Sequence, residues 1–337
     1  MNVLGIESSC DETSVAVISN NILSANLISS QDFHSKFGGV VPELSSRAHL
    51  QIIIPLVKDA LKKSGLELKD LDLICATAGP GLIGALLVGL TFAKGLAYSL
   101  NKPFVAVNHI EGHIFSGFLM DQKPEFPFLV LVVSGGHTLL LLVKSFSEIR
   151  KLGTTVDDAA GEAFDKVAKM LGLGYPGGPK IQKYSIEGDK NKIKFPVAQL
   201  DNPLNFSFSG LKTAVLRYVK KNYPDGKKIP HQDICDIAAS FQEAVIKPLI
   251  LNTERALNKY EIKSISLVGG VAANSVLRDS FIELSDRYNK KVVIPKFEYC
   301  GDNAAMIAYR GAKLFEAGER HNLKFSPFQG LTSENFM

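Results

Sequence analysis

The 337-residue sequence predicts an α/β protein in which a βββαβαβα unit occurs twice. Three observations support this fold class. Apolar segments of strand length alternate with segments of helical period in both halves of the chain. Pairs of strands that suit a hairpin occur at corresponding positions in the two halves, which a single large α/β domain, the alternative, does not explain. The length also suits two domains, because one domain typically takes about 150 residues.

The first half contains every element of the unit. In chain order we expect three strands at Val3–Ser8, Ser14–Ser19 and Ile22–Ile28, and then a helix at about Ser46–Lys63. A strand at Leu71–Ala76 leads through the Gly79-Pro80-Gly81 loop to a helix that ends at Leu100. A strand at Phe104–Val107 and a helix at about His109–Met120 complete the unit.

The second half repeats this order, with an insertion where the first helix of the unit should lie. It begins with two strands at Phe128–Val133 and Thr138–Val143, and a weaker third strand follows them. After the insertion come a strand at Ser264–Val268, a helix from Asn274, a strand at Lys291–Ile294 and a helix from Asp302. The insertion, at about 153–260, reads as mainly helical. A duplicated unit of this order is typical of actin-like (ASKHA) two-lobed folds, in which nucleotide lies between the lobes. We expect lobes at 1–125 and 126–337, the last helix packing in the second lobe or back on the first.

Composition excludes several classes of protein. A formal net charge of +4 with 46% apolar and 21% charged residues is ordinary for a soluble protein and too small a bias to indicate a nucleic-acid partner. The most apolar stretches, 80–100 and 126–143, are interrupted by glycine or polar residues before they reach the ~20 residues of a membrane span. The start of the chain does not read as a signal peptide. Four cysteines without a Cys-x-x-Cys pair argue against a zinc ribbon or a disulfide scaffold, so we expect a cytoplasmic protein and no membrane partner.

Basic clusters in the insertion leave two interpretations open. They lie at Lys190–Lys194, Lys220-Lys221 and Lys227-Lys228. Such runs usually mark solvated helix faces and loops, and the alternative is a surface that follows a nucleic-acid backbone.

Glycine-containing turns indicate a nucleotide. They lie at Ser8–Thr13, Gly79–Gly84, Ser134–Thr138 and Gly269–Asn274. Glycine at a strand end lets backbone N–H groups approach a phosphate, and a following helix N-terminus adds a favourable field. No P-loop motif is present. The Gly79–Gly84 segment matches G-x-G-x-x-G, but the next strand does not end in the carboxylate that a dinucleotide site needs, so a dehydrogenase is only a weak rival.

A histidine pair indicates a metal. His109 and His113 are four residues apart, which places both imidazoles on one helix face. At about 100° per residue, Glu111 points to the opposite side, so it cannot act as the base of a zinc peptidase. Asp302, at the start of the last helix, is a candidate third ligand, and capping that helix is its structural alternative. Two imidazoles and a carboxylate with open positions suit Fe(II), Zn or Mn. We expect this metal to bridge the two lobes, with His109 and His113 from the first lobe and Asp302 from the second.

At these residues the chain resembles the TsaD (Gcp) family of tRNA adenosine threonylcarbamoyltransferases, which is related to the Kae proteins. The matching segments occur in family order over nearly the whole chain: GIESSCDETSVAV, ATAGPGLIGAL, NHIEGH, LVVSGGHT, FDKVAKMLGLGYPGGP, FSFSGLKTAV, LVGGVAANSVLR and CGDNAAMIAY.

The resemblance implies transfer of a threonylcarbamoyl group from threonylcarbamoyl-AMP to N6 of adenosine 37 in tRNAs that read ANN codons. It implies one divalent metal per chain, Fe(II) or alternatively Zn, held by His109, His113 and Asp302, and an adenylate donor or ATP in the cleft. It assigns the nucleotide contacts to Val132, Val133, Ser134, Gly135, Gly136, Asp165, Gly178 and Asn274. Gln182 stands where archaeal relatives carry a further acidic contact. The implied partners are the tRNA anticodon loop, a TsaB-like paralogue and a TsaE-like ATPase.

The chemistry needs few catalytic groups. The donor already carries a good leaving group, so positioning, charge stabilisation and a base suffice. Asp11 and Glu12, in the first-lobe turn, are the candidates for a base or for orienting substrate, and a turn or cap role is their structural alternative. A zinc metallopeptidase and an actin-like ATPase or sugar kinase remain as alternative functions.

Overall fold

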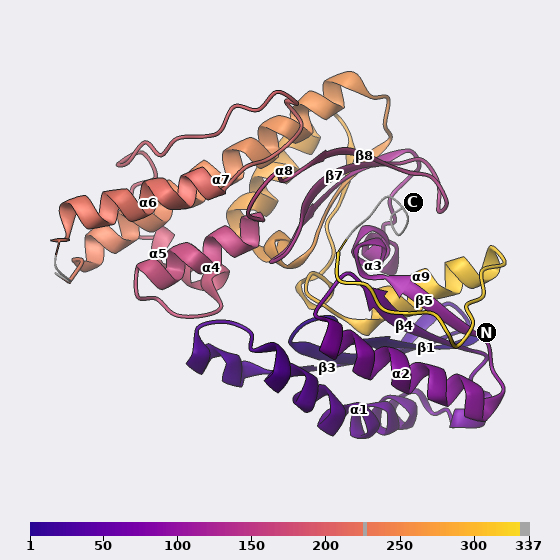
Figure 1. The fold of residues 1–337 in the computed structure, drawn as a ribbon. Coiled ribbons are helices and arrows are strands. Elements are labelled where there is room, and N and C mark those ends of the chain that lie inside the picture. The colour runs from indigo at the N-terminus through magenta and orange to yellow at the C-terminus, as the bar shows by residue number, and fades with distance from the viewer. Residues whose placement is uncertain (225–227, 331–337) are drawn as a thin grey trace. The chain divides into compact units, whose positions relative to one another are not determined.

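The computed structural model describes residues 1–224 and 228–330. Lys227, part of one predicted basic cluster, lies outside them. The described residues contain two five-stranded sheets, and each belongs to its own compact unit (Figure 1). One unit comprises residues 1–123 and 295–337, and the other comprises residues 124–294.

The first sheet has the strand order β3-β2-β1-β4-β5. The strands β1, β2 and β3 form an antiparallel meander, and β4 and β5 extend the sheet from β1 in parallel. Their bounds are Asn2–Glu7, Glu12–Ser19, Ile22–Ser30, Leu73–Gly79 and Phe104–Asn108. The parallel strands are buried throughout, as expected for a sheet that helices cover on both faces.

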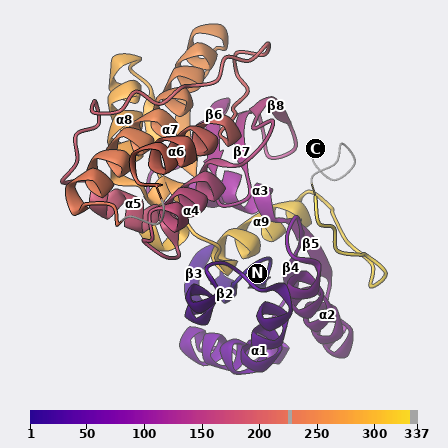
Figure 2. The same cartoon turned by 60° about the vertical axis from the view of Figure 1, so that its left-hand side comes forward.

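Helices cover both faces of this sheet (Figure 2). α1 (Pro42–Ser64) and α2 (Ile83–Leu100) pack on the face that includes Leu4 and Ile6. α9 (Ala304–Glu316) packs on the other face, against Val3 and its neighbours. Successive residues of a strand point to opposite faces, so β1 contributes to both cores. The short helix α3 (His109–Phe115), which continues as the 3-10 turn η3 (Ser116–Leu119), packs against α9.

Helix α2 is long and apolar enough to span a membrane by length and composition alone. In the fold, however, its residues Ala85, Leu90 and Ala93 are buried in the core beneath β4 and beside α1. Core helices pass the same test, so this helix is weak evidence for a membrane span.

The second sheet repeats the first, with the order β10-β9-β6-β7-β8. Again three strands form an antiparallel meander, and two more extend it in parallel from the first of the three. The bounds of β6 to β10 are Phe128–Val133, Thr138–Val143, Ile149–Thr154, Ser264–Val268 and Lys291–Val293. The matching strand orders confirm the duplication that the sequence predicts, and β8 is its weak third strand.

The inserted region is mainly helical, as predicted. It contains α4 (Ala160–Met170), α5 (Gly177–Ser185), α6 (Ser209–Asn222) and α7 (His231–Lys259). α7 leads into β9 as α1 leads into β4, and α8 (Ser275–Arg287) follows β9. α7 contacts β6 and α8, whereas α5 and α6 pack on α7. Figure 2 shows these helices gathered beside the second sheet.

The last helix belongs to the first unit. Met306, Ile307 and Ala312 on α9 are buried against Val105 and Val107 of the first sheet. This is the second of the two placements that the sequence left open. The chain therefore leaves its first unit at residue 123 and returns to it at residue 295.

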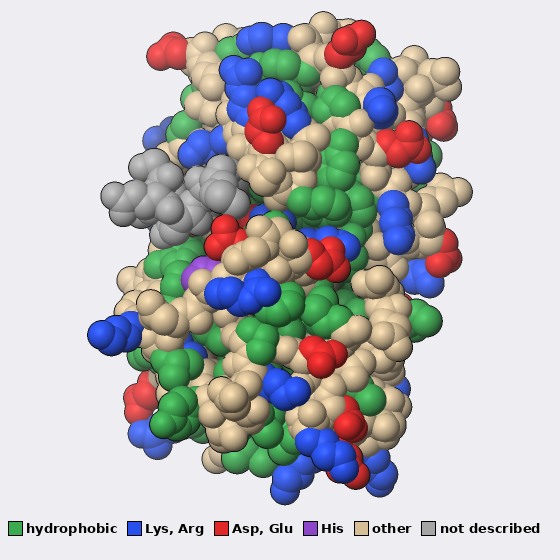
Figure 3. Space-filling view, turned by 90° about the vertical axis from the view of Figure 1, so that its right-hand side faces the viewer, with side chains coloured by type: hydrophobic (Ala, Val, Ile, Leu, Met, Phe, Trp, Pro, Cys, Tyr) green, Lys and Arg blue, Asp and Glu red, His purple; other side chains and the backbone are tan. Residues whose placement is uncertain are grey.

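Charge is mixed on the surface face drawn in Figure 3. Lys and Arg side chains there are interspersed with Asp, Glu and apolar ones. The net charge of +4 is therefore not gathered into one basic area on the described part of this face.

Candidate functional site

The histidine pair lies where a parallel strand passes directly into a helix. β5 ends at Asn108, whose side-chain oxygen accepts hydrogen bonds from the backbone N–H groups of Ile110 and Glu111. This cap begins α3 at His109, so His109 and His113 fall on the same face one turn apart. Their rings lie edge to face with centroids 4.7 Å apart, and both are buried.

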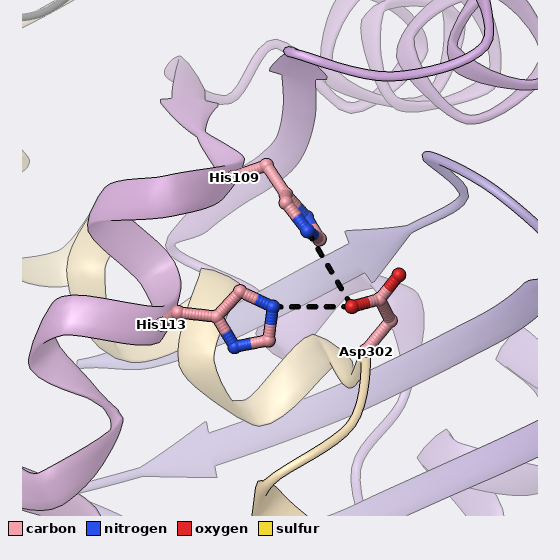
Figure 4. A group of neighbouring side chains, drawn as sticks. All are labelled: His109, His113 and Asp302. Carbon is pink, nitrogen blue, oxygen red and sulfur yellow. Dashed lines mark hydrogen bonds and ion pairs between the residues drawn. The ribbon is translucent and has the colours of Figure 1, made fainter. Parts of the chain in front are cut away.

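Asp302 faces both histidines from the segment before α9 (Figure 4). One carboxylate oxygen, Oδ1, lies 3.1 Å from Nε2 of His113 and 3.4 Å from Nε2 of His109. The helix cap is Asn303, which accepts from the N–H of Met306. Asp302 is therefore not used as the cap, which was its structural alternative.

The expected bridge between two lobes is wrong. His109, His113 and Asp302 all belong to the first compact unit. The physical reason is the apolar face of α9, which is buried on the first sheet and brings Asp302 to α3.

Glu7 contacts the ring nitrogen of His109 that faces away from Asp302. Its carboxylate is fully buried at the end of β1, and its Oε2 lies 3.1 Å from Nδ1 of His109. The backbone N–H of Ser9 donates to Oε1 at 2.6 Å, and the hydroxyl of Thr77 donates to Oε2 at 2.6 Å. A carboxylate on the far nitrogen of a metal-binding histidine fixes the ring and makes it a stronger ligand. Glu7 thus leaves Nε2 of His109 free to face Asp302.

Glu111 is engaged elsewhere, as the helix geometry predicts. Its Oε2 accepts from Nε of Arg310 at 2.7 Å and lies 2.6 Å from the Nη2 atom of that side chain. The Arg310 guanidinium also lies over the ring of Phe115, 4.6 Å from its centroid. Both charged groups are almost fully buried. The pair ties α3 to α9, and Glu111 is not available as the base of a peptidase.

Burial and the neighbouring charges have opposite effects on the pKa values of His109 and Asp302. Burial favours the neutral imidazole, but the negative charges and hydrogen bonds of Asp302 and Glu7 outweigh it and hold the pKa of His109 well above its ordinary value. Burial likewise disfavours the Asp302 carboxylate, but the charge of His109 and hydrogen bonds from both histidines hold the pKa of Asp302 well below its ordinary value. In the metal-free chain, Asp302 and Glu7 therefore favour the protonated form of His109.

Asp11 and Glu12 lie in the same electrostatic environment. Burial, followed by the negative charges of Asp302 and Asp11, raises the pKa of Glu12 to about 9. Glu12 is the first residue of β2, and the carbonyl of Asp11 accepts from the N–H of Gln31. The turn that carries both acids therefore lies close enough to Asp302 for the two carboxyl groups of Glu12 and Asp302 to interact.

Helix α1 anchors this turn through His49. Nε2 of the imidazole lies 3.0 Å from the carbonyl oxygen of Cys10, and Nδ1 lies 2.7 Å from the hydroxyl of Thr13. The hydroxyl of Ser45 also donates to the Cys10 carbonyl. The side chains of Ser45 and His49 are both fully buried, so they fix the turn to α1.

The three donors suit a divalent metal. The ligand atoms of His109, His113 and Asp302 all lie within 4.8 Å of one another. Two imidazoles and one carboxylate match the donor set of non-haem Fe(II) sites with open positions, and zinc accepts the same ligands. The residues therefore fit the metal that the sequence predicts.

The candidate nucleotide residues lie in the second unit. The turn between β6 and β7 is closed by a hydrogen bond from the Ser134 N–H to the His137 carbonyl, 2.8 Å long. Val132 and Val133 are fully buried at the end of β6, so neither offers exposed surface to a ligand in this structure. A side chain at Gly135 or Gly136 would meet no other atom within 4 Å. The two glycines leave bare, exposed backbone.

Asp165 contacts the start of α5, next to Gly178. The carboxylate of Asp165 accepts from the N–H of Gly177 at 2.6 Å. Gly178 is the next residue, and a side chain there would also meet open space. Helix α5 is joined to α8 because Oε1 of Gln182 accepts from the N–H of Ser275 at 2.9 Å. Gln182 thus has a structural partner.

Asn274 caps α8. Its Oδ1 accepts from the N–H of Leu277 at 3.0 Å, and its Nδ2 donates to Oε1 of Gln242 at 2.8 Å. The preceding Gly269 (φ 93°) lies against the end of β6, where a Cβ would fall 2.5 Å from the carbonyl oxygen of Val133. The Asn274 loop and the Ser134 turn therefore follow neighbouring parallel strands, β9 and β6, at the same edge of the sheet.

The G-x-G-x-x-G segment of the first unit is filled by the protein itself. A Cβ at Gly79, Gly81 or Gly84 would lie 2.1 to 2.6 Å from an oxygen of Phe328, Ser9 or Ser46. These glycines allow close packing within the unit and leave no room for a pyrophosphate, which removes the dehydrogenase rival.

Comparison with known proteins identifies the family. The sequence model of TsaD, described as tRNA N6-adenosine threonylcarbamoyltransferase, matches residues 21–309. The chain belongs to the TsaD family. A tRNA N6-adenosine threonylcarbamoyltransferase from Thermosipho africanus is 54% identical over 94% of this chain and 96% of its own length. One from Symbiobacterium thermophilum is 47% identical over 98% and 96%, respectively.

Solved structures confirm the actin-like fold of this TsaD-family chain. HypF from T. kodakarensis superposes with a TM-score of 0.63 at 15% identity, over 94% of this chain and 48% of HypF. Component A of the (R)-2-hydroxyglutaryl-CoA dehydratase of Acidaminococcus fermentans gives 0.54 at 13% identity, over 95% and 100%. At these identities the likeness concerns the fold alone.

Sequence reasoning missed three supporting residues of this TsaD-family site: Glu7, His49 and Arg310. Glu7 acts on a histidine 102 positions away, and Arg310 binds a glutamate 199 positions away. No local spacing links such partners. The signal available for Arg310 was a charged residue on the apolar face of the last helix, because a buried charge needs a partner.

Proposed function

We propose that this chain forms N6-threonylcarbamoyladenosine at position 37 of tRNAs that read ANN codons, with threonylcarbamoyl-AMP as the donor. Membership of the TsaD family supports the reaction. The observation that carries the proposed site is the buried meeting of His109, His113 and Asp302, backed by Glu7.

The reaction joins a weak nucleophile to an activated carbonyl. A bond forms between N6 of adenosine and the carbamoyl carbon, the bond from that carbon to the phosphate oxygen breaks, AMP leaves, and N6 loses a proton. The demands on the protein are orientation of both substrates and stabilisation of charge on the carbamoyl oxygen. When bound, a divalent metal, Fe(II) or alternatively Zn, would supply a Lewis acid for that charge.

The protein side chains divide the remaining work. His109, His113 and Asp302 would hold the metal, and Glu7 orients the His109 ring so that Nε2 faces inward. Asp11 and Glu12 are the acids assigned to orient the acceptor or to take the proton from N6. A carboxyl whose pKa is raised to about 9 is mainly protonated at neutral pH, so Glu12 suits orientation of the acceptor better than removal of its proton.

The adenylate part of the donor is assigned to the second unit. The bare backbone of Gly135 and Gly136 and the open space at Gly178 suit ribose and phosphate. Asp165 and Asn274 would shape this site rather than bind through free side chains, because both already make hydrogen bonds inside the protein. Phosphate contact is favoured at the N-terminus of α5.

Partners and location follow as part of the proposal. The acceptor is the anticodon loop of tRNA, a TsaB-like paralogue and a TsaE-like ATPase are the accessory proteins, and the site of action is the cytoplasm.

The deciding experiment is nucleoside analysis of tRNA after incubation with threonine, bicarbonate, ATP and the other enzymes of the pathway. We expect the modified adenosine only when this chain is present and when the tRNA carries adenosine at position 37. Steady ATP turnover by the chain alone, without modified tRNA, would instead indicate an ATPase or a sugar kinase. Cleavage of peptides that is lost in Glu111→Gln would indicate a peptidase.

A further inference from the structure

A second cluster of ligand-type side chains lies in the helical insert, apart from every residue assigned above. It comprises Glu187, just after α5, and His231 and Cys235 in the first turns of α7. Like the first cluster, its three ligand atoms lie within 4.8 Å of one another. Nε2 of His231 lies 3.3 Å from Oε2 of Glu187 and 3.7 Å from Sγ of Cys235.

These separations match the edges of a tetrahedral zinc site. Bonds of about 2.0–2.1 Å to nitrogen and oxygen and about 2.3 Å to sulfur place neighbouring ligand atoms roughly 3.3 Å apart for N···O and roughly 3.6 Å apart for N···S. Both measured distances lie close to these values. His231 and Cys235 are four residues apart on a helix, so they share one face.

The loop that carries Glu187 is fixed to α7 by its backbone. The Glu187 carbonyl accepts from Nε2 of Gln232 at 3.1 Å, and the Asp189 N–H donates to Oδ1 of Asp236 at 2.9 Å. Between them, a Cβ at Gly188 would lie only 2.0 Å from the carbonyl oxygen of Cys235. The loop therefore touches α7 where only glycine fits, and the backbone that carries Glu187 is held against the start of this helix.

We propose that Glu187, His231 and Cys235 form a second metal site of this chain, which binds Zn²⁺ with water in the fourth position. The carboxylate and the thiolate neutralise the ion, so the positive field at the start of α7 does not oppose it. The metal replaces the proton of the Cys235 thiol, which is released to water.

The site would join the C-terminal end of α5 to the N-terminal end of α7. Its role is structural, because the metal closes a loop of the insert over 44 positions of sequence. Residue spacing could not reveal it, since the chain has no Cys-x-x-Cys pair and the glutamate lies 44 positions before His231, in the turn after α5.

Cobalt absorption tests this site separately from the one at His109. Metal-free protein is titrated with Co²⁺, and a thiolate ligand gives a charge-transfer band in the near ultraviolet. We expect the band in the wild type and in Asp302→Ala, and its loss in Cys235→Ser and on addition of Zn²⁺. Cys10→Ser should keep the band and is the control, because Cys10 lies by the first site, where burial and then the charges of Asp11 and Asp302 raise the pKa of its thiol.

Zinc content gives the second readout. In the Asp302→Ala background, His231→Ala and Glu187→Ala should each lower bound Zn²⁺ and remove the rise in melting temperature that Zn²⁺ causes. Both side chains are about two-thirds exposed, so these variants should fold even if Cys235→Ser does not. Absence of a thiolate band from the wild type, or its persistence in Cys235→Ser, would overturn the proposal.

Discussion

The Oε2 atom of Glu7 lies 3.1 Å from Nδ1 of His109, although the two residues are 102 positions apart in the sequence. The carboxylate comes from the end of β1 and the imidazole from the start of α3. This contact makes the first strand of the fold part of the metal site.

Glu7→Gln should weaken metal binding without removing a ligand. The amide keeps the volume but loses the negative charge that orients and polarises His109, so we expect about 10- to 100-fold lower metal affinity. Competition with a chromophoric chelator measures it. Glu111→Gln is the matched control, since it neutralises another buried carboxylate of the same unit and should keep the metal. Equal affinity in Glu7→Gln and the wild type would show that the contact does not tune the site.

Removal of any metal ligand should abolish binding at this site. We expect His109→Ala, His113→Ala and Asp302→Ala each to lose bound iron and transferase activity together while the chain stays folded. Metal analysis, circular dichroism and tRNA nucleoside analysis are the three measurements. Each variant is made in the Cys235→Ser background, so that the second proposed site does not contribute bound metal. Full metal content in Asp302→Ala would show that the histidines use another third ligand.

The buried side chains of Glu111 and Arg310 should be coupled in their contributions to the free energy of unfolding. Removing one partner leaves a buried charge, so Arg310→Met should lower the free energy of unfolding by about 3–5 kcal/mol. The double variant Glu111→Gln/Arg310→Met should lose much less than the sum of the two single variants, because no unpaired charge remains. Urea unfolding of all four proteins completes the cycle. Additive losses would mean that the ion pair contributes no coupling between α3 and α9.

Stabilisation by metal should grow with pH. In the metal-free chain the raised pKa of His109 means that its attraction to Asp302 and Glu7 is fully present below ~6.5, the unfolded value, and is lost as pH rises through the folded pKa. The lowered pKa of Asp302 adds stability above ~3.9 that is lost at lower pH. Metal must displace the His109 proton, so it competes better at high pH.

We therefore expect the gain in melting temperature from saturating metal, measured in Cys235→Ser, to increase between pH 6 and pH 8.5. Asp302→Ala/Cys235→Ser should show no gain at any pH. A gain that is constant over this range would mean that no proton is displaced from His109.

Gly136→Val should separate nucleotide binding from folding. A Cβ at this position would meet no other protein atom within 4 Å and the residue is exposed, so the melting temperature should hardly change. It occupies the space assigned to the adenylate, and crowding of this kind costs about 1–3 kcal/mol, or roughly 5- to 150-fold in the affinity for AMP. Calorimetric titration with AMP measures it. Gly210→Val, where the space is equally open, is the control. Unchanged affinity in folded Gly136→Val would place the nucleotide elsewhere.

The sequence predicted the sheets well and the site in part. Strand positions follow from local apolar pattern, and the histidine pair follows from spacing along one helix, so both are visible in a single sequence. The position of Asp302 is not, because it depends on which sheet buries the apolar face of α9. The spacing also could not show that Asn303, one residue later, takes the cap and leaves Asp302 to the histidines.

The return of the chain to its first sheet has a consequence during protein synthesis. The second unit is continuous, from 124 to 294, and can fold as soon as it leaves the ribosome, whereas the first lacks α9 and Asp302 until the last 43 residues have been made. One face of the first sheet, including Val3 and Val105, has no helix to cover it until then. The nascent first unit should therefore expose apolar surface that chaperones bind, and it can acquire its metal only after translation reaches Asp302.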